Sequence, residues 1–85
     1  MAQIGVDRAE QLRVERLLLV KADSDIEDGR RRLRSQEDLL LGLRAGGHDT
    51  KQAERLVELM KTTLDEWERH RVLILQRVAY LESVV

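Results

Sequence analysis

Large aliphatic residues recur at every seventh position through the first half of this chain. The row consists of Leu12, Leu19, Ile26, Leu33 and Leu40. Seven residues are close to two turns of α-helix, so this spacing gives a helix one continuous apolar stripe. The pattern predicts a long helix that packs its stripe against a second helix.

The second half of the chain carries two rows of the same period. One row is Ala53, Met60, Trp67, Ile74 and Leu81, and the other is Val57, Leu64, Arg71, Val78 and Val85. The companion row of the first half is weaker, with small or polar residues at most positions: Glu15, Ala22, Gly29, Gln36 and Leu43. Because close packing matches large side chains to small ones, we expect the two halves to pack on each other.

Two adjacent glycines separate the two patterned segments. Gly46 or Gly47 can adopt the left-handed backbone conformation that ends a helix. Asp49 then occupies an N-cap position, and Gln52 completes a capping-box pattern three residues later. The sequence therefore predicts one all-α domain, an antiparallel, coiled-coil-like two-helix hairpin with a helix at 7–45, a turn at 46–49 and a helix at 50–83.

The glycine pair has an alternative interpretation as a phosphate-binding loop. Such a loop follows a buried β-strand and leads into a helix that begins with Lys-Ser or Lys-Thr. Here the preceding segment, QEDLLLGLRA, has helical composition, and Thr50 precedes Lys51 rather than following it. The context therefore favours a simple turn.

An antiparallel hairpin centred on the glycine pair brings defined residues to the same height. Core layers then include Leu40 with Ala53, Gly29 with Leu64 and Ile26 with Trp67. Three flanking pairs in this register have opposite charges: Arg16 with Glu82, Arg30 with Glu68, and Glu37 with Lys61. Exposed ion pairs add little stability, but their agreement with the core supports the register.

Composition narrows the class of protein. The 85 residues include no cysteine and no proline, 36% are charged, and the net charge is −1. This excludes a disulfide scaffold and is typical of long helices and coiled coils. The longest apolar runs are too short to span a bilayer, and the first residues lack a signal-peptide pattern. We expect a cytoplasmic protein that has no membrane role.

Chemistry-bearing residues are sparse. No nucleophile–base arrangement is present, and two helices form no pocket of their own, so we expect no enzyme activity and no cofactor. Arg71 interrupts an apolar row near Ala22. Its stem is expected to cover Ala22 while its guanidinium reaches Asp25 or solvent; alternatively, it is a buried polar residue that fixes partner number or register.

Two alternative functions rest on charged groups. His70, Glu66 and Asp25 could form a metal site, but a di-metal bundle requires paired Glu-x-x-His motifs, and here the spacing is Glu-x-x-x-His. The segment from Arg30 to Arg34 could contact nucleic acid, but acidic residues bracket it, and phosphate binding requires uncompensated positive charge. We therefore expect neither a metal nor nucleic acid as the main partner.

Several large apolar residues fall outside the predicted seam. They are Leu18, Leu39, Leu56, Leu59, Leu73 and Tyr80. A contiguous apolar surface of this extent is typical of an interface. The sequence predicts an interaction module that forms a homodimeric four-helix bundle through these residues, or that docks on another protein.

The segment IEDGRRRLRSQ, followed by the turn GHDT, resembles a family of short uncharacterised alphaproteobacterial proteins. The shared positions are Ile26, Gly29, Arg32, Leu33 and Gln36, then Gly47 to Thr50, with Ala53, Leu56 and His70–Arg71 beyond. The resemblance covers about residues 24 to 78. It implies a helical hairpin from a bacterium, cytoplasmic and non-enzymatic, and it supplies no ligand or catalytic residues.

Overall fold

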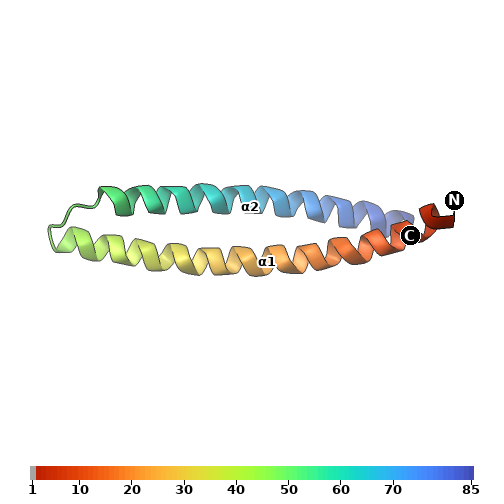
Figure 1. The fold of residues 1–85 in the computed structure, drawn as a ribbon, viewed down its shortest axis with the longest axis horizontal. Helices are drawn as coiled ribbons and strands as arrows, with labels where there is room; N and C mark the ends of the chain where they lie inside the picture. The colour runs from red at the N-terminus through yellow and green to blue at the C-terminus, as the bar shows by residue number, and fades with distance from the viewer. Residues whose placement is uncertain (1) are drawn as a thin grey trace.

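Two long helices form the whole described fold. A computed structural model describes residues 2–85, with side chains from residue 7 onward. Helix α1 spans Ala2–Ala45 and helix α2 spans Lys51–Val84, and the two lie side by side in opposite directions (Figure 1). The hairpin measures 66 × 18 × 15 Å. The predicted all-α hairpin is confirmed.

The helix ends differ slightly from the predicted ones. Helix α1 ends at Ala45 as predicted, but it begins at Ala2 rather than at residue 7. No proline interrupts the first residues, and a single glycine such as Gly5 costs a helix only about 1 kcal/mol. Helix α2 begins and ends one residue later than predicted.

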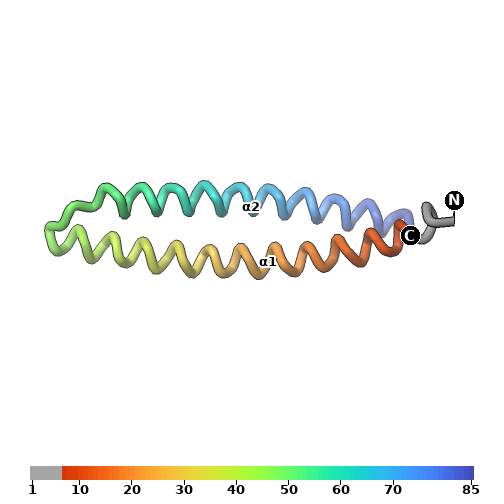
Figure 2. The backbone as a smooth tube through the Cα atoms, viewed as in Figure 1, coloured from red at the N-terminus to blue at the C-terminus, as the bar shows by residue number. Residues whose placement is uncertain are grey.

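The turn between the helices is a Schellman motif built on Gly47. The φ angle of Gly47 is 72°, in the left-handed region. The His48 N–H donates to the Leu43 carbonyl at 3.0 Å, and the Gly47 N–H donates to the Arg44 carbonyl at 3.1 Å. These two hydrogen bonds satisfy carbonyls that would otherwise be left unpaired at the end of α1. The tube in Figure 2 follows the resulting reversal.

The N-cap of α2 is Thr50, so the prediction of Asp49 at this position is wrong. The first α-helical hydrogen bond runs from the Glu54 N–H to the Thr50 carbonyl at 2.9 Å, which places the helix start one residue later. The Asp49 carboxylate still accepts the Lys51 N–H at 3.1 Å. Among the described residues, Gln52 forms no hydrogen bond back to residue 49, so the capping box is absent.

The core is a single seam between the helices. Its buried residues come from the predicted heptad rows: Leu12, Ile26, Leu40, Val57, Leu64, Ile74, Val78 and Leu81. The densest cluster lies toward the chain ends, where Leu12 packs with Ile74, Val78 and Leu81, and where Leu19 and Ala22 are partly buried. The seam holds the two helices in one register along their length.

The register matches the predicted one. A Cβ at Gly29 would lie 2.7 Å from Leu64 Cδ2, so these two residues face each other as expected. All three predicted ion pairs are formed. They are Arg16–Glu82 at 2.8 Å, Arg30–Glu68 at 2.6 Å and Lys61–Glu37 at 4.0 Å. Trp67 departs from the prediction, because its large ring lies at the edge of the seam and remains 39% exposed.

Candidate interaction face

One face of the hairpin is closed by ion pairs between the helices. We call it the paired face. Its α1 residues follow the core leucines and isoleucine by four positions and so share one side of the helix. The pairs are Arg16–Glu82, Asp23–Arg71, Arg30–Glu68, Glu37–Lys61 and Arg44–Glu54. Charged side chains therefore bridge the two helices from near the chain ends to the turn.

The opposite face, which we call the open face, carries the six apolar residues predicted as an interface. Leu18 and Leu39 each precede a core residue of α1 by one position, and Leu56 does so in α2. Leu59, Leu73 and Tyr80 lie next to this row on the outer side of α2. Exposed fractions of the six run from 41% for Leu18 to 62% for Leu59. Their exposure agrees with the prediction, and their contact with a copy remains a prediction.

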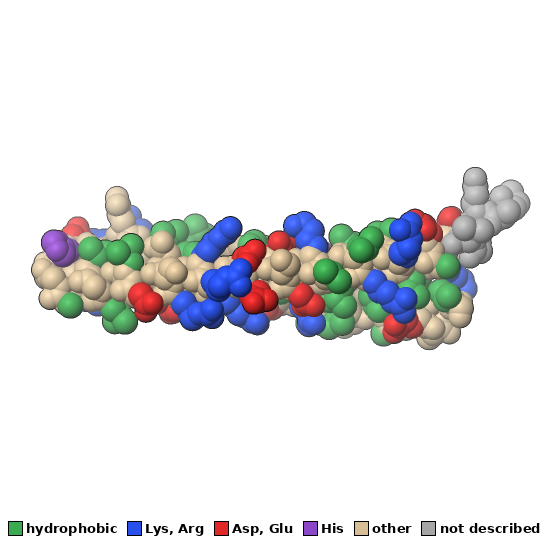
Figure 3. Space-filling model, turned by 90° about the horizontal axis from the view of Figure 1, so that it is seen from below, with side chains coloured by type: hydrophobic (Ala, Val, Ile, Leu, Met, Phe, Trp, Pro, Cys, Tyr) green, Lys and Arg blue, Asp and Glu red, His purple; other side chains and the backbone are tan. Residues whose placement is uncertain are grey.

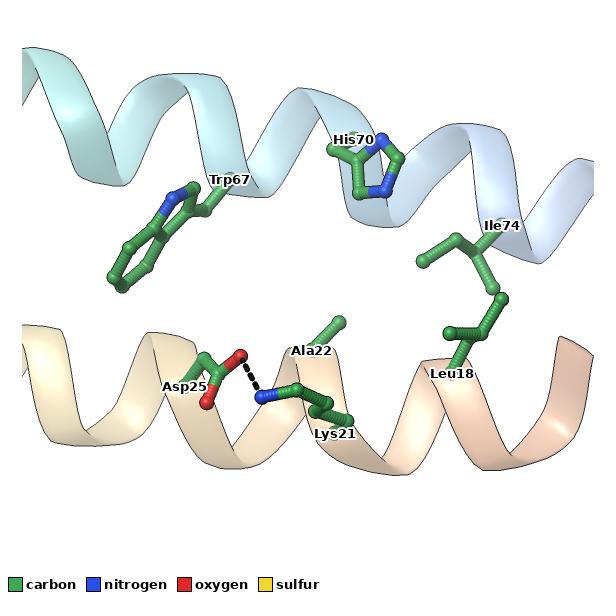
Figure 4. Close-up of a pocket in the computed structure, with 7 residues that line it drawn as sticks. All are labelled: Leu18, Lys21, Ala22, Asp25, Trp67, His70 and Ile74. Carbon is green, nitrogen blue, oxygen red and sulfur yellow. Dashed lines mark hydrogen bonds and ion pairs between the residues drawn. The ribbon is translucent and has the colours of Figure 1, made fainter.

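A shallow groove of about 230 Å³ opens on this face (Figure 4). Its lining residues are Leu18, Lys21, Ala22, Asp25, Trp67, His70 and Ile74. Ala22, in the weak row of α1, lines the groove, and its small side chain leaves this space open. It is an open depression with mainly apolar walls, suited to receiving side chains from another helix.

The three residues of the alternative metal site, Asp25, Glu66 and His70, do not all line one site. Asp25 and His70 line the same groove, but Glu66 is not part of the lining. The Asp25 carboxylate instead accepts the Lys21 ammonium at 3.0 Å. Within residues 7–85, no group of three or more metal-binding side chains converges. The groove thus holds one carboxylate, Asp25, and one imidazole, His70, and no third metal-binding side chain in its lining.

Arg71 pairs with Asp23, whereas the sequence predicts that its guanidinium reaches Asp25 or solvent, so Asp25 is the wrong partner. Asp25 lies on the open face, whereas the Arg71 side chain leaves the seam toward the paired face and meets Asp23 there. The Arg71 side chain is 36% exposed, and no polar residue of the described part is fully buried. The proposed buried polar residue is therefore half-buried and ion-paired.

The arginine-rich segment is partly neutralised. Arg30 pairs with Glu68 on α2, and Arg31 pairs with Glu27 and Asp28 on its own helix. Arg32 and Arg34 form no ion pair among the described side chains. Several basic side chains gather near the middle of the face shown in Figure 3, with acidic side chains beside them, and they do not continue as a stripe along the hairpin. Neighbouring carboxylates thus offset much of the charge that phosphate binding would need.

Comparisons with protein-family models, with curated proteins and with solved structures found no match for this chain. They therefore leave the family resemblance seen in the sequence as a prediction. In the part of the chain that the structure describes, neither helix has a stretch long and apolar enough to cross a membrane.

Proposed function

We propose that this chain is a non-enzymatic interaction module that forms a homodimer through its open face. Two hairpins packed by these faces make an antiparallel four-helix bundle with twofold symmetry. The observation that carries the proposal is the contrast between the two faces. Five of the six ion pairs that join the helices in the described part lie on one of them, while the other holds six large exposed apolar residues, one of which, Leu18, lines the groove.

Burial favours association. Among described side chains, eight hydrophobic residues are buried, whereas fourteen large hydrophobic residues are exposed. A helix pair of this length needs more apolar burial than a single seam supplies, because chains this short have little stability in reserve. Each large apolar side chain taken from water contributes about 1.5–3 kcal/mol. Covering the open face therefore stabilises the hairpin substantially.

Surface area points the same way. The chain exposes 6513 Å². A compact monomer of 9.9 kDa would expose about 5,200 Å² by the usual scaling with mass. The surplus of about 1,300 Å² exceeds the roughly 800 Å² that each partner buries in a standard interface. A second copy is a sufficient partner, because an isologous interface uses the same face twice.

We also propose a cellular setting for the module. We place it in the bacterial cytoplasm, where a chain without cysteine needs no oxidising environment and where the family resemblance also puts it. There it would present the remaining helix surfaces to another macromolecule. The alternative is a small nucleic-acid-associated regulator that uses the segment from Arg30 to Arg34, in which Arg32 and Arg34 form no ion pair among the described side chains.

Sedimentation across a concentration series tests the proposal. We expect a dimer at tens of micromolar for the natural chain, and dissociation with partial loss of helix for a Leu59→Glu, Leu73→Glu double variant. The matched control changes Leu41 and Val72 to Glu. These two residues are also exposed, but they line grooves on the paired face, so dimerisation should persist. A well-folded natural monomer at these concentrations would refute self-association.

A further inference from the structure

One row of side chains on the open face of α1 is self-complementary. Leu18, Asp25, Arg32 and Leu39 follow one another at steps of seven residues, so they share one side of the helix. Read from either end, the row begins with a leucine, and the two inner residues carry opposite charges. An antiparallel copy of the row therefore sets leucine against leucine and aspartate against arginine.

The two charged members of this row, Asp25 and Arg32, can each form a further ion pair. The Asp25 carboxylate accepts Lys21 with Oδ2, and its side chain is 44% exposed. Arg32 is exposed and forms no ion pair with the described side chains, unlike Arg30 and Arg31 beside it. A second copy can supply the missing carboxylate for Arg32.

A second row, on α2, has the same symmetry. Leu59 and Leu73 lie seven residues on either side of Glu66, so an antiparallel copy places Leu59 against Leu73. Both leucines are at least half exposed. The midpoint of this row is Glu66, and the midpoint of the α1 row lies between Asp28 and Gly29.

These two midpoints lie at one height along the hairpin. A Cβ on Gly29 would lie 2.7 Å from Leu64 Cδ2 and 3.2 Å from Trp67 Cζ3, so Gly29 faces the α2 segment that contains residue 66. The rows are on different helices, yet both are symmetric about the same point. A single twofold axis through that point satisfies both rows at once.

We propose that two hairpins pack antiparallel about this axis, with α1 against α1 of the copy and α2 against α2 of the copy. This inference rests on the self-association proposed above and specifies its geometry. Leu18 of each copy contacts Leu39 of the other, and Asp25 of each pairs with Arg32 of the other. Leu59 meets Leu73 in the same way on α2.

The alternative twofold arrangement fits less well. An axis along the hairpin would place α1 over α2 of the copy, with residues of equal height in contact. Leu18 would then face the height of Arg77, which already pairs with Glu15 at 2.8 Å. Arg32 would face the height of Thr63, an uncharged residue, rather than that of a carboxylate. The charges therefore favour the antiparallel arrangement.

Charge reversal tests the proposed pairing. Asp25→Arg or Arg32→Asp alone sets like charges against each other at both symmetric contacts, so each should weaken dimerisation about tenfold. The double variant restores opposite charges and should return the dissociation constant to within about threefold of the natural value. Glu27→Arg with Arg34→Glu is the matched control, because these residues have the same spacing and charge order in a different row. All single and double control variants should leave the constant unchanged.

Disulfide cross-linking provides a test that does not depend on electrostatics. The chain contains no cysteine, so introduced thiols have no competitors. Leu18 and Leu39 are 21 residues apart on one helix, about 31 Å, and cannot bridge within a chain. A Leu18→Cys, Leu39→Cys variant should oxidise to a covalent dimer. Val20→Cys with Leu41→Cys has the same separation in another row and should not.

The outcomes separate the two proposals. A natural dimer with the cysteine cross-link and charge rescue supports the antiparallel arrangement. A natural dimer without either result overturns that arrangement while leaving self-association intact. A natural chain that sediments as a folded monomer overturns both. Circular dichroism of each variant shows whether loss of the dimer comes from unfolding. Where a charge variant unfolds, the cysteine pair, which introduces no charge, decides between the two arrangements.

Discussion

Gly29 of α1 lies directly opposite Leu64 of α2, and a methyl group at residue 29 would approach Leu64 Cδ2 to 2.7 Å. The ring of Trp67 lies beside the same point, at 3.2 Å. A side chain at residue 29 would therefore occupy space that these two residues now use. The small residue sets the spacing of the helices at the centre of the seam.

Comparing two glycines tests this contact. Alanine at an interior helix position is favoured over glycine by up to about 1 kcal/mol. At Gly42, a Cβ meets nothing within 4 Å, so Gly42→Ala should raise the free energy of unfolding by several tenths of a kcal/mol or more. Gly29→Ala should gain about 1 kcal/mol less than Gly42→Ala, because buried Leu64 must move. Urea unfolding of both variants provides the comparison, and equal gains would contradict the close contact.

The left-handed residue of the turn makes a second prediction. Because φ of Gly47 is 72°, Gly47→Val should lower the free energy of unfolding by about 1–2 kcal/mol. Gly46→Ala is the control: its φ is not positive, and the only side chain its Cβ meets is the end of exposed His48. Thermal melts should show a clear loss for the first variant and a much smaller change for the second. A comparable loss of stability in both variants would show that backbone strain at residue 47 is not the cause of the destabilisation.

Asp49 still contributes to the start of α2, although it is not the N-cap. Its carboxylate accepts the Lys51 N–H at 3.1 Å, one of the donors that a helix start leaves unpaired. Asp49→Ala should therefore destabilise the hairpin by about 0.5–1 kcal/mol. Gln52→Ala should have almost no effect, since Gln52 forms no capping hydrogen bond among the described residues. Urea unfolding midpoints of the two variants distinguish these roles. If Gln52→Ala destabilised the hairpin more than Asp49→Ala, Gln52 would have a capping role after all.

The seam could be predicted from sequence because heptad spacing determines which residues of the two helices lie at the same position along the hairpin. Once Gly29 was set against Leu64, the pairs Arg16–Glu82 and Arg30–Glu68 followed. The position of a residue along the helix axis does not determine the face of the hairpin toward which its side chain points. For this reason the sequence predicts the wrong partner for Arg71. The N-cap is Thr50 rather than the predicted Asp49. The Schellman motif uses the His48 N–H to complete the end of α1, so α2 begins one residue later.

The open face was only partly predictable. Leu18 and Leu59 could be identified as exposed because they fall outside the two seam rows. The ion pairs Asp23–Arg71 and Arg44–Glu54 were not predicted, so the contrast between the faces appeared only in the structure. Sequence alone also cannot show how far the Trp67 ring extends from the seam, since that depends on its rotamer against Gly29.

Acid should weaken the turn through Glu54. Hydrogen bonds from Arg44, and then from Thr50, hold the pKa of this carboxyl below its ordinary value. A lowered folded-state pKa means that the stabilisation is complete above the ordinary glutamate pKa and is lost as the pH falls through the lower folded value. Glu54→Gln should therefore flatten part of the acid side of the stability profile. Urea unfolding at a series of pH values measures this effect, and unchanged acid dependence in the variant would contradict it.

The last prediction concerns the proposed twofold axis, where Glu66 would lie close to its own copy. Two exposed carboxylates facing each other repel modestly, so Glu66→Gln should tighten dimerisation about two- to fivefold at low salt. The gain should shrink as salt is added, because screening already weakens the repulsion. Glu58→Gln is a suitable control, since Glu58 lies beside Lys61 and lines a groove on the paired face. Sedimentation equilibrium at two salt concentrations provides both comparisons. In the arrangement with an axis along the hairpin, Glu66 would lie away from its copy, and the variant would leave the dissociation constant unchanged.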